Sequence, residues 1–284
     1  MKLIRFGEPG SEKPGVELPD GKRIDVSTYT EDFDRRFYRE NGIDGLREWV
    51  EKNGDKAPAV NGVRLGPPVS EPGKLICIGL NYEDHAREGG MELPKEPIIF
   101  FKATSSICGP NDDLIIPKNS QKTDWEVELA VVIGKEASYI TAEEAMDYVA
   151  GYVLHNDYSE RAFQFDRGGQ WVKGKSCDTF APLGPYVVTK DEIDDIHNTR
   201  LWLKVNDEMV QDGNTSELIF NIPFLVSHLS EFMTLQPGDI ISTGTPAGVG
   251  LGFEPQRFLK PGDVVELGID GLGESRQEAR AYGA

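Results

Sequence analysis

The chain has 284 residues, 38% of them hydrophobic, which suits a large folded domain with a sizeable core and argues against a disordered segment. Its formal net charge of -18 argues against partners that need a basic surface, namely nucleic acids and anionic membranes. The N-terminal residues lack the apolar stretch of a secretory signal, and no apolar run approaches the ~20 residues that span a bilayer. We therefore expect a cytoplasmic protein that binds neither nucleic acid nor a membrane.

Residues 1–70 are expected to form a small β-containing domain. Residues 1–6 alternate as in a strand, and residues 14–27 are typical of a hairpin in which Asp20-Gly21 provides the positive φ angles of the turn. A short helix is predicted over 43–53. The Pro- and Gly-rich stretch 65–74 suggests a boundary, so a second, larger domain would occupy residues 71–284.

The rest of the chain is predicted to be mostly strand, because β-branched and aromatic residues recur in short runs. The predicted strands are 75–79, 97–101, 113–117, 126–134, 148–157, 184–189, 200–205, 239–244 and 263–269, with a hairpin turn at 205–208. Helices are fewer: 141–144 matches a capping box, and 222–233 has apolar residues at helical spacing. This balance predicts a β-rich α+β fold, either a barrel or a rolled mixed sheet.

Two carboxylates share one face of a predicted strand. Alternate residues of a strand point to the same side, so Glu126 and Glu128 project together while their odd-numbered neighbours face apolar packing. Two like charges so close are unfavourable unless a cation lies between them or one is protonated. The alternative is a solvent-exposed strand on which both carboxylates are simply hydrated.

A third carboxylate, Asp157, ends an apolar predicted strand, where a central strand would meet a cleft. With the glutamate pair it would give three hard oxygen ligands, which suit Mg²⁺, Mn²⁺ or Ca²⁺ better than zinc. Three protein ligands would leave coordination positions for substrate and water, as a catalytic metal requires. The alternative role for Asp157 is the N-cap of a helix over 159–165.

A possible acid–base pair lies in a short predicted helix that follows an apolar strand. His85 and Glu88 are three residues apart, which places them on neighbouring turns of one helix face. A carboxylate beside an imidazole can orient it and raise its basicity, as in a water-activating dyad. The alternative is an ordinary surface His–Glu pair.

Six segments together resemble the fumarylacetoacetate hydrolase family and occur in the order found there. They are GLNYEDHARE (79–88), PIIFFKATSSICGPND (97–112), DWEVELAVVIGK (124–135), HNDYSERAFQ (155–164), KGKSCDTFAPLGP (173–185) and GDIISTGTPAGVG (238–250). The resemblance implies a β-rich α+β fold, a mixed β-sandwich roll with a small N-terminal domain and a larger catalytic domain, and usually a homodimer. It also implies metal-dependent hydrolysis of a C–C bond in a small 2,4-diketo acid substrate.

The resemblance implies a set of metal ligands and a water-activating pair. The family's metal ligands match Glu126, Glu128 and Asp157, and its water-activating histidine and carboxylate match His85 and Glu88. The expected cofactor is Mg²⁺ or Mn²⁺.

Further positions are implied to bind the substrate. Lys175 matches a lysine near the metal and the substrate oxygens, and Arg161 and Gln164 match substrate contacts of some members. Thr245 matches a residue at the substrate carboxylate. A metal ion with Lys175 and Arg161 would make one cationic pocket on an acidic protein, which suits an anionic substrate.

One segment departs from the common family pattern and bears on the substrate. Many members read Asp-x-Ser-Ala-Arg-Asp, whereas residues 157–164 read DYSERAFQ and Gly-Gln-Trp follows at 169–171. This variant looks most like the branch that acts on 2,4-diketo-3-deoxy sugar acids, often labelled ureidoglycolate lyase. We expect 2,4-diketo-3-deoxy-L-fuconate or -rhamnonate to be cleaved to pyruvate and a short hydroxy acid.

The same residues also suit other functions. The same chemistry could serve an acylpyruvate hydrolase or an oxaloacetate decarboxylase or tautomerase, and ureidoglycolate lyase is a further option. The alternative of another class is a metabolite-binding protein without catalytic activity.

Overall fold

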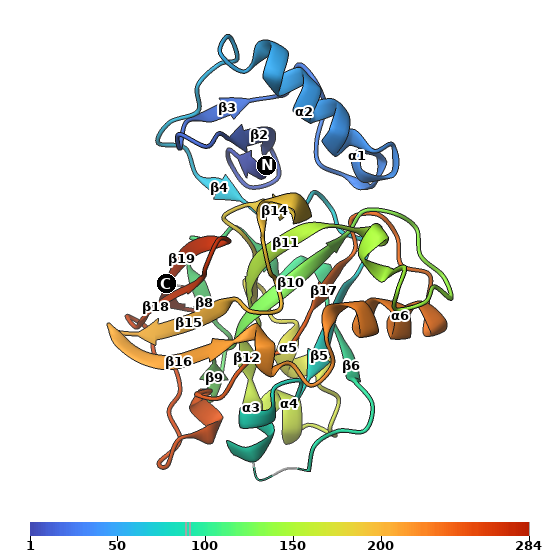
Figure 1. Cartoon of the computed structure of the whole chain (residues 1–284). Helices are drawn as coiled ribbons and strands as arrows, with labels where there is room; N and C mark the ends of the chain where they lie inside the picture. The colour runs from blue at the N-terminus through green and yellow to red at the C-terminus, as the bar shows by residue number, and fades with distance from the viewer. Residues whose placement is uncertain (89, 91, 284) are drawn as a thin grey trace.

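A ten-stranded mixed sheet dominates the computed structural model, which describes residues 1–88, 90 and 92–283 (Figure 1). The strand order is β3-β2-β1-β14-β11-β10-β17-β5-β6, with β4 paired to β1. These strands are β1 (Lys2–Phe6), β2 (Lys13–Glu17), β3 (Arg23–Asp25), β4 (Leu65–Gly66), β5 (Leu75–Gly79), β6 (Ile98–Lys102), β10 (Val127–Ile133), β11 (Val149–Asn156), β14 (Val187–Thr189) and β17 (Ile240–Ser242). β10 and β11 pair antiparallel, whereas β17 and β5 run parallel.

A five-stranded sheet packs against the large one. Its order is β16 (Glu208–Asn214), β15 (Arg200–Val205), β18 (Val264–Ile269), β19 (Gly273–Ala281) and β8 (Leu114–Ile116). Two short pairs complete the strands: β12 (Ser159–Glu160) with β9 (Thr123–Asp124), and β13 (Ala181–Pro182) with β7 (Ile107–Cys108). Both large sheets are open in the part of the chain that is described, so the β-rich α+β prediction is confirmed as a rolled mixed-sheet fold rather than a closed barrel.

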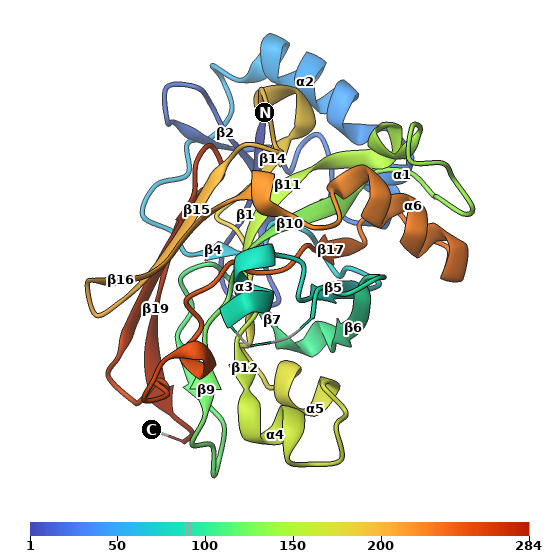
Figure 2. The ribbon, with the colours of Figure 1, turned by 60° about the horizontal axis from the view of Figure 1, so that its bottom comes forward.

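The α-helices are short and lie around the sheets. They are α1 (Arg35–Arg39), α2 (Gly42–Asn53), α3 (Glu83–Glu88), α4 (Arg161–Phe165), α5 (Val172–Lys175) and α6 (Ile222–Phe232). In Figure 1, α3, α4 and α5 lie at the end of the molecule opposite the N-terminal strands, and Figure 2 turns that end toward the viewer. None of the described helices is long and apolar enough to cross a bilayer.

The large sheet is buried on both faces, and β10 shows how. Its seven residues are all buried, and successive side chains point to opposite faces. Val127 and Leu129 belong to a core shared with the five-stranded sheet and α6. Ala130 and Val132 belong to a second core shared with the N-terminal helices. The alternation predicted for this segment is confirmed, and it puts Glu128 on the side of the second core.

The N-terminal strands extend the large sheet, because β1 pairs with β14 as well as with β2. The predicted helix over 43–53 is present as α2, and the predicted hairpin is present as β2 and β3. In its turn, Gly21 has φ of +82°, but Asp20 does not adopt a positive φ, so that detail of the prediction is wrong. The domain boundary near residue 70 remains a prediction.

Differences from the sequence predictions have local physical causes. The turn at 205–208 forms with positive φ at Asn206 and Asp207, but the strand β16 that follows was not predicted. β19 was also missed, because its inward residues include Ser275 and Gln277 rather than β-branched ones. In the capping box, the Glu144 carboxylate accepts from the backbone N–H at residue 141, but the segment it opens is a 3-10 turn.

Candidate active site

Three buried carboxylates converge at the adjoining ends of β10 and β11. Glu126 directly precedes β10, Glu128 lies within it, and Asp157 directly follows β11. A hydrogen bond of 2.9 Å from the Asp157 backbone N–H to the Glu126 carbonyl ties the two strand ends together. The three residues are at most 5% exposed, and one oxygen of each carboxylate lies within 4.8 Å of the others. This set, called the triad below, fits a hard divalent cation such as Mg²⁺ or Mn²⁺.

Asp157 does not cap the helix that follows it. The N-cap of α4 is Glu160, whose side chain accepts a hydrogen bond from the backbone N–H of Ala162. The N-cap alternative for Asp157 is therefore wrong. The Asp157 carboxylate instead points toward the other two carboxylates of the triad, and two lysines contact it.

Two buried lysines balance the charge of the triad. Lys175 Nζ donates to Glu126 Oε2 at 2.7 Å and to Asp157 Oδ2 at 2.8 Å. Lys102 Nζ donates to Asp157 Oδ1, and to the Tyr158 carbonyl at 3.0 Å. Burial alone would raise the pKa of Asp157, but the two ammonium groups lower it below its ordinary range, so Asp157 is ionised.

Lys102 was not among the predicted site residues. The one sequence signal for Lys102 is its position directly after the apolar run 97–101, where a lysine could equally have been solvent-exposed. In the structure it ends β6 and is 2% exposed.

Glu128 has a different electrostatic environment. Burial, together with the charges of Asp157 and Glu126, raises the pKa of Glu128 well above its ordinary value. The Ser242 hydroxyl donates to Glu128 Oε2, and His155 Nδ1 lies 2.7 Å from the same hydroxyl oxygen. Burial lowers the pKa of His155 to about 3, so its ring is neutral. Since the Ser242 hydroxyl has one hydrogen, His155 Nδ1–H donates to it when Glu128 is ionised, and this chain orients the carboxylate.

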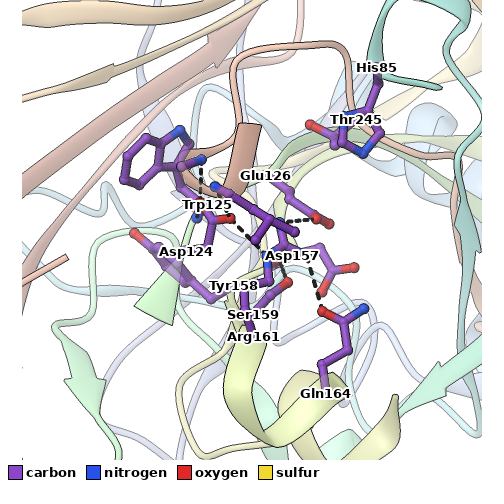
Figure 3. A network of polar contacts seen from close by, with 12 residues as sticks. His85, Asp124, Trp125, Glu126, Asp157, Tyr158, Ser159, Arg161, Gln164 and Thr245 are labelled. Atoms are coloured by element: carbon purple, nitrogen blue, oxygen red, sulfur yellow. Dashed lines mark hydrogen bonds and ion pairs between the residues drawn. The ribbon is translucent and has the colours of Figure 1, made fainter. Parts of the chain in front are cut away.

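Arg161 connects the triad to α4 (Figure 3). Its Nη2 donates to Glu126 Oε1 at 2.7 Å, its Nε donates to Asp124 Oδ2 at 2.8 Å, and its Nη1 donates to Gln164 Oε1 at 3.1 Å. Arg161 and Gln164 were predicted as substrate contacts, and the structure places both beside the triad.

Asp124 is a fourth buried carboxylate, and the sequence patterns did not single it out. It accepts from the backbone N–H groups of Trp125 at 2.8 Å, Gly250 at 2.6 Å and Leu251 at 3.0 Å, besides Arg161. Asp124 therefore fixes Arg161 against the 3-10 helix Gly250–Gly252. Its four donors come from three separate segments, so no local pattern could have revealed this role.

The predicted dyad lies on α3. His85 Nδ1 is 3.4 Å from Glu88 Oε2, and the two side chains are 14% and 20% exposed. The backbone N–H of Gly248 donates to Glu88 Oε1 at 3.0 Å, which anchors the carboxylate on a neighbouring loop. A Cβ atom at Gly252 would lie 2.3 Å from the Glu88 carboxyl carbon, so glycine at that position permits the approach.

One cavity of about 420 Å³ brings the predicted residues together. His85, Glu88, Glu126, Glu128, Arg161, Gln164, Lys175 and Thr245 line it. Asp157 lies behind this lining, in contact with Lys175. The Thr245 hydroxyl donates to the Val127 carbonyl at 2.9 Å, so its hydrogen is already used within the protein. The pocket combines a hard-cation site, an ammonium group and an imidazole, which suits the chemistry of small oxygen-rich acids.

These features define a class of proteins with a rolled β-sheet fold and a carboxylate-rich site that fits a divalent metal. The chain belongs to the fumarylacetoacetate hydrolase family, because the family model described as fumarylacetoacetate (FAA) hydrolase C-terminal matches residues 74–280. A Burkholderia multivorans protein that carries only the general name of hydrolase is 52% identical over 285 residues, covering 99% of both chains.

Solved structures agree with this assignment over the full length. The fumarylacetoacetate hydrolase of the psychrophile Exiguobacterium antarcticum is 35% identical with a TM-score of 0.86, covering 99% of each chain. A maleylpyruvate hydrolase from Sphingobium sp. SYK-6, solved with manganese(II) and pyruvate, is 31% identical with a TM-score of 0.83, again covering 99% of each chain. These relatives support an enzyme, and the manganese complex supports a divalent-metal site in the family.

Proposed function

We propose that this chain is a hydrolase that cleaves the C3–C4 bond of a small 2,4-diketo acid and releases pyruvate. One observation carries the proposal: Glu126, Glu128, Lys175 and the His85–Glu88 pair line a single cavity, and Asp157 completes the candidate metal site directly behind it. The similarity to a maleylpyruvate hydrolase that was solved with manganese(II) and pyruvate supports this reaction class.

The inner end of the cavity would bind and polarise the diketo group. A divalent cation held by Glu126, Glu128 and Asp157 would act as a Lewis acid toward the substrate carboxylate and 2-keto oxygen. Lys175 uses two of its three N–H donors on the triad, so one remains for the oxygen on which negative charge develops. A contact of this kind typically contributes about 3–4 kcal/mol to the transition state.

The dyad would supply the attacking water. Because His85 Nδ1 faces Glu88, its Nε2 is the atom available to take a proton from water. The resulting hydroxide attacks C4, the C3–C4 bond breaks, and its electron pair passes to C3. C3 then takes up the proton carried by His85. One water is consumed, and the products are pyruvate and the carboxylic acid of the acyl arm.

Within this class we propose 2,4-diketo-3-deoxy-L-fuconate or -rhamnonate as the substrate, with a short hydroxy acid as second product. The segment DYSERAFQ at 157–164, with the Gly-Gln-Trp that follows, supports this choice. We also propose that the working form is a homodimer and that the cofactor is Mg²⁺ or Mn²⁺.

A pyruvate-release screen against several diketo acids, with and without EDTA, tests the proposal. Glu126→Gln and Asp157→Asn should lose both metal binding, measured by titration calorimetry, and turnover. His85→Ala should bind metal normally but lose hydrolysis, whereas His228→Ala, outside the cavity, should remain active. Wild-type turnover in His85→Ala would exclude the water-activating role and favour a decarboxylase, and release of urea and glyoxylate would establish a lyase.

A further inference from the structure

A row of three aromatic rings leads outward from the inner end of the cavity. Lys175 Nζ lies 5.1 Å from the centre of the Phe100 ring. The ring centres of Phe100 and Trp171 are 5.3 Å apart, and those of Trp171 and Phe165 are 6.2 Å apart. All three rings line the cavity, and the exposed fraction rises from 9% at Phe100 to 45% at Phe165. These residues, called the aromatic wall below, run from the triad to solvent.

The central ring of the wall lies close against the end of β5. A Cβ atom at Gly79 would fall 2.7 Å from Cζ3 of the Trp171 indole, so the glycine allows this close packing. Ile78, Val249 and Leu251 add further apolar atoms to the lining. Along the aromatic wall the cavity therefore offers apolar surface rather than ionic partners.

The cationic groups that line the cavity already face carboxylates. Lys175 donates to two carboxylates of the triad, Arg161 donates to Asp124 and to the triad, and His85 contacts Glu88. Among the described residues, the lining includes no other lysine, arginine or histidine. A divalent cation bound at the inner end would face the substrate's own 1-carboxylate and keto oxygen. It would therefore not be available to a second carboxylate on the arm.

We infer that the substrate arm beyond C4 lies along the aromatic wall and is uncharged. A carboxylate placed there would lose hydration without gaining an ionic partner. An alkyl or hydroxyalkyl arm would instead bury apolar surface against the rings, and the loss of hydration at a neutral hydroxyl costs far less than at a carboxylate. This inference rests on the proposed function, and it selects acids with one carboxylate over diacids of the same length.

A matched pair of substrates tests the inference in the metal-loaded protein. Butanoylpyruvate and succinylpyruvate share the diketo acid head and the arm length, and they differ in a terminal methyl or carboxylate group. We expect kcat/KM to be at least tenfold higher for butanoylpyruvate. Equal values, or a preference for succinylpyruvate, would overturn the inference while leaving the proposed hydrolysis of the C3–C4 bond intact. If neither acid releases pyruvate, the proposed function fails and the inference fails with it.

A charge introduced at the outer end of the wall should change the preference. Phe165→Arg supplies the missing cation. It should raise the ratio of kcat/KM for succinylpyruvate over butanoylpyruvate about tenfold, which is the effect expected of one partly screened ion pair. Phe165→Met, which shortens the wall without adding charge, should keep the preference for the neutral arm.

The position of the added charge needs its own control. Phe232→Arg makes the same substitution at an exposed aromatic on α6 outside the cavity and should leave the ratio unchanged. The gain in Phe165→Arg should shrink as salt is raised. A folded Phe165→Arg variant with an unchanged ratio would show that the arm does not follow the wall.

Discussion

The buried carboxylate of Asp124 provides a direct test of how the active site is supported. Oδ1 accepts from the backbone N–H groups of Trp125 and Gly250, and Oδ2 accepts from Arg161 Nε and the Leu251 N–H. Asp124→Asn preserves the shape but replaces one oxygen by an NH₂ group. If the amide oxygen keeps the first pair of donors, the NH₂ group faces the second pair, and two hydrogen bonds are lost.

The expected loss of stability follows from this count. Hydrogen bonds to charged groups contribute about 1.5–3 kcal/mol each, so two of them give about 3–6 kcal/mol. Removing one partner of a buried ion pair costs about 3–5 kcal/mol when the remaining charge is left uncompensated. Asp124 and Arg161 are both at most 5% exposed, but Arg161 keeps Glu126 as a partner, so the lower part of this range applies. We therefore expect a loss of about 4 kcal/mol, which corresponds to a fall in Tm of roughly 8 °C for a chain of this size.

Urea unfolding and thermal melting of the metal-free protein measure this loss. Asp34→Asn is the matched control, because Asp34 caps α1 by accepting from the Phe37 N–H and asparagine is an equally good N-cap. The control should change the free energy of unfolding by less than about 0.5 kcal/mol. A loss below about 1 kcal/mol in Asp124→Asn would refute the claim that its four hydrogen bonds stabilise the fold.

Three other predictions concern the metal ligands and the assembly. Ser242→Ala should weaken metal binding about tenfold by calorimetry, because Glu128 loses its orienting hydroxyl, and unchanged affinity would contradict this role. The pKa of Glu128 in the folded apo protein lies above its ordinary value of 4.5, so between these two pH values the folded protein holds a proton that the unfolded chain has released. The stability of the folded protein should therefore fall as pH rises from 4.5 through the raised pKa. Urea unfolding across pH measures this trend, which Glu128→Gln should flatten. Analytical ultracentrifugation should give about twice the chain mass of 31.5 kDa, and a monomer at micromolar concentration would exclude the proposed homodimer.

Local sequence patterns were sufficient for features that depend on neighbouring residues. The two-residue period placed Glu126 and Glu128 on one face and their neighbours in the core, and it did so without knowledge of the sheet. Helical spacing similarly predicted α6, whose start is fixed by Asn221 as N-cap. The convergence of Asp157 on the pair was a hypothesis, since it requires β10 and β11 to be adjacent.

Contacts between distant segments could not be predicted in this way. Lys102 reaches Asp157 across 55 positions, and Arg161 reaches Asp124 across 37. A lysine after an apolar strand gives no sign of a buried partner, because such a residue usually extends into solvent. β19 was not predicted for a related reason. Its inward residue Gln277 is held by specific hydrogen bonds, including one from the Tyr158 hydroxyl, rather than by apolar packing.

The register of β10 against β11 has a consequence for how this site can change. Val127 lies opposite Asn156 and Glu128 opposite His155, and Glu126 and Asp157 directly adjoin these pairs at the strand ends, so the register of the two strands sets the spacing of the three carboxylates. Inserting one residue at the start of β10 would turn Glu128 toward the opposite core. The rings at the outer end, by contrast, come partly from short helices and a connecting segment. In the proposed binding mode, exchanging those rings would change the substrate specificity while the arrangement of the three carboxylates stays the same.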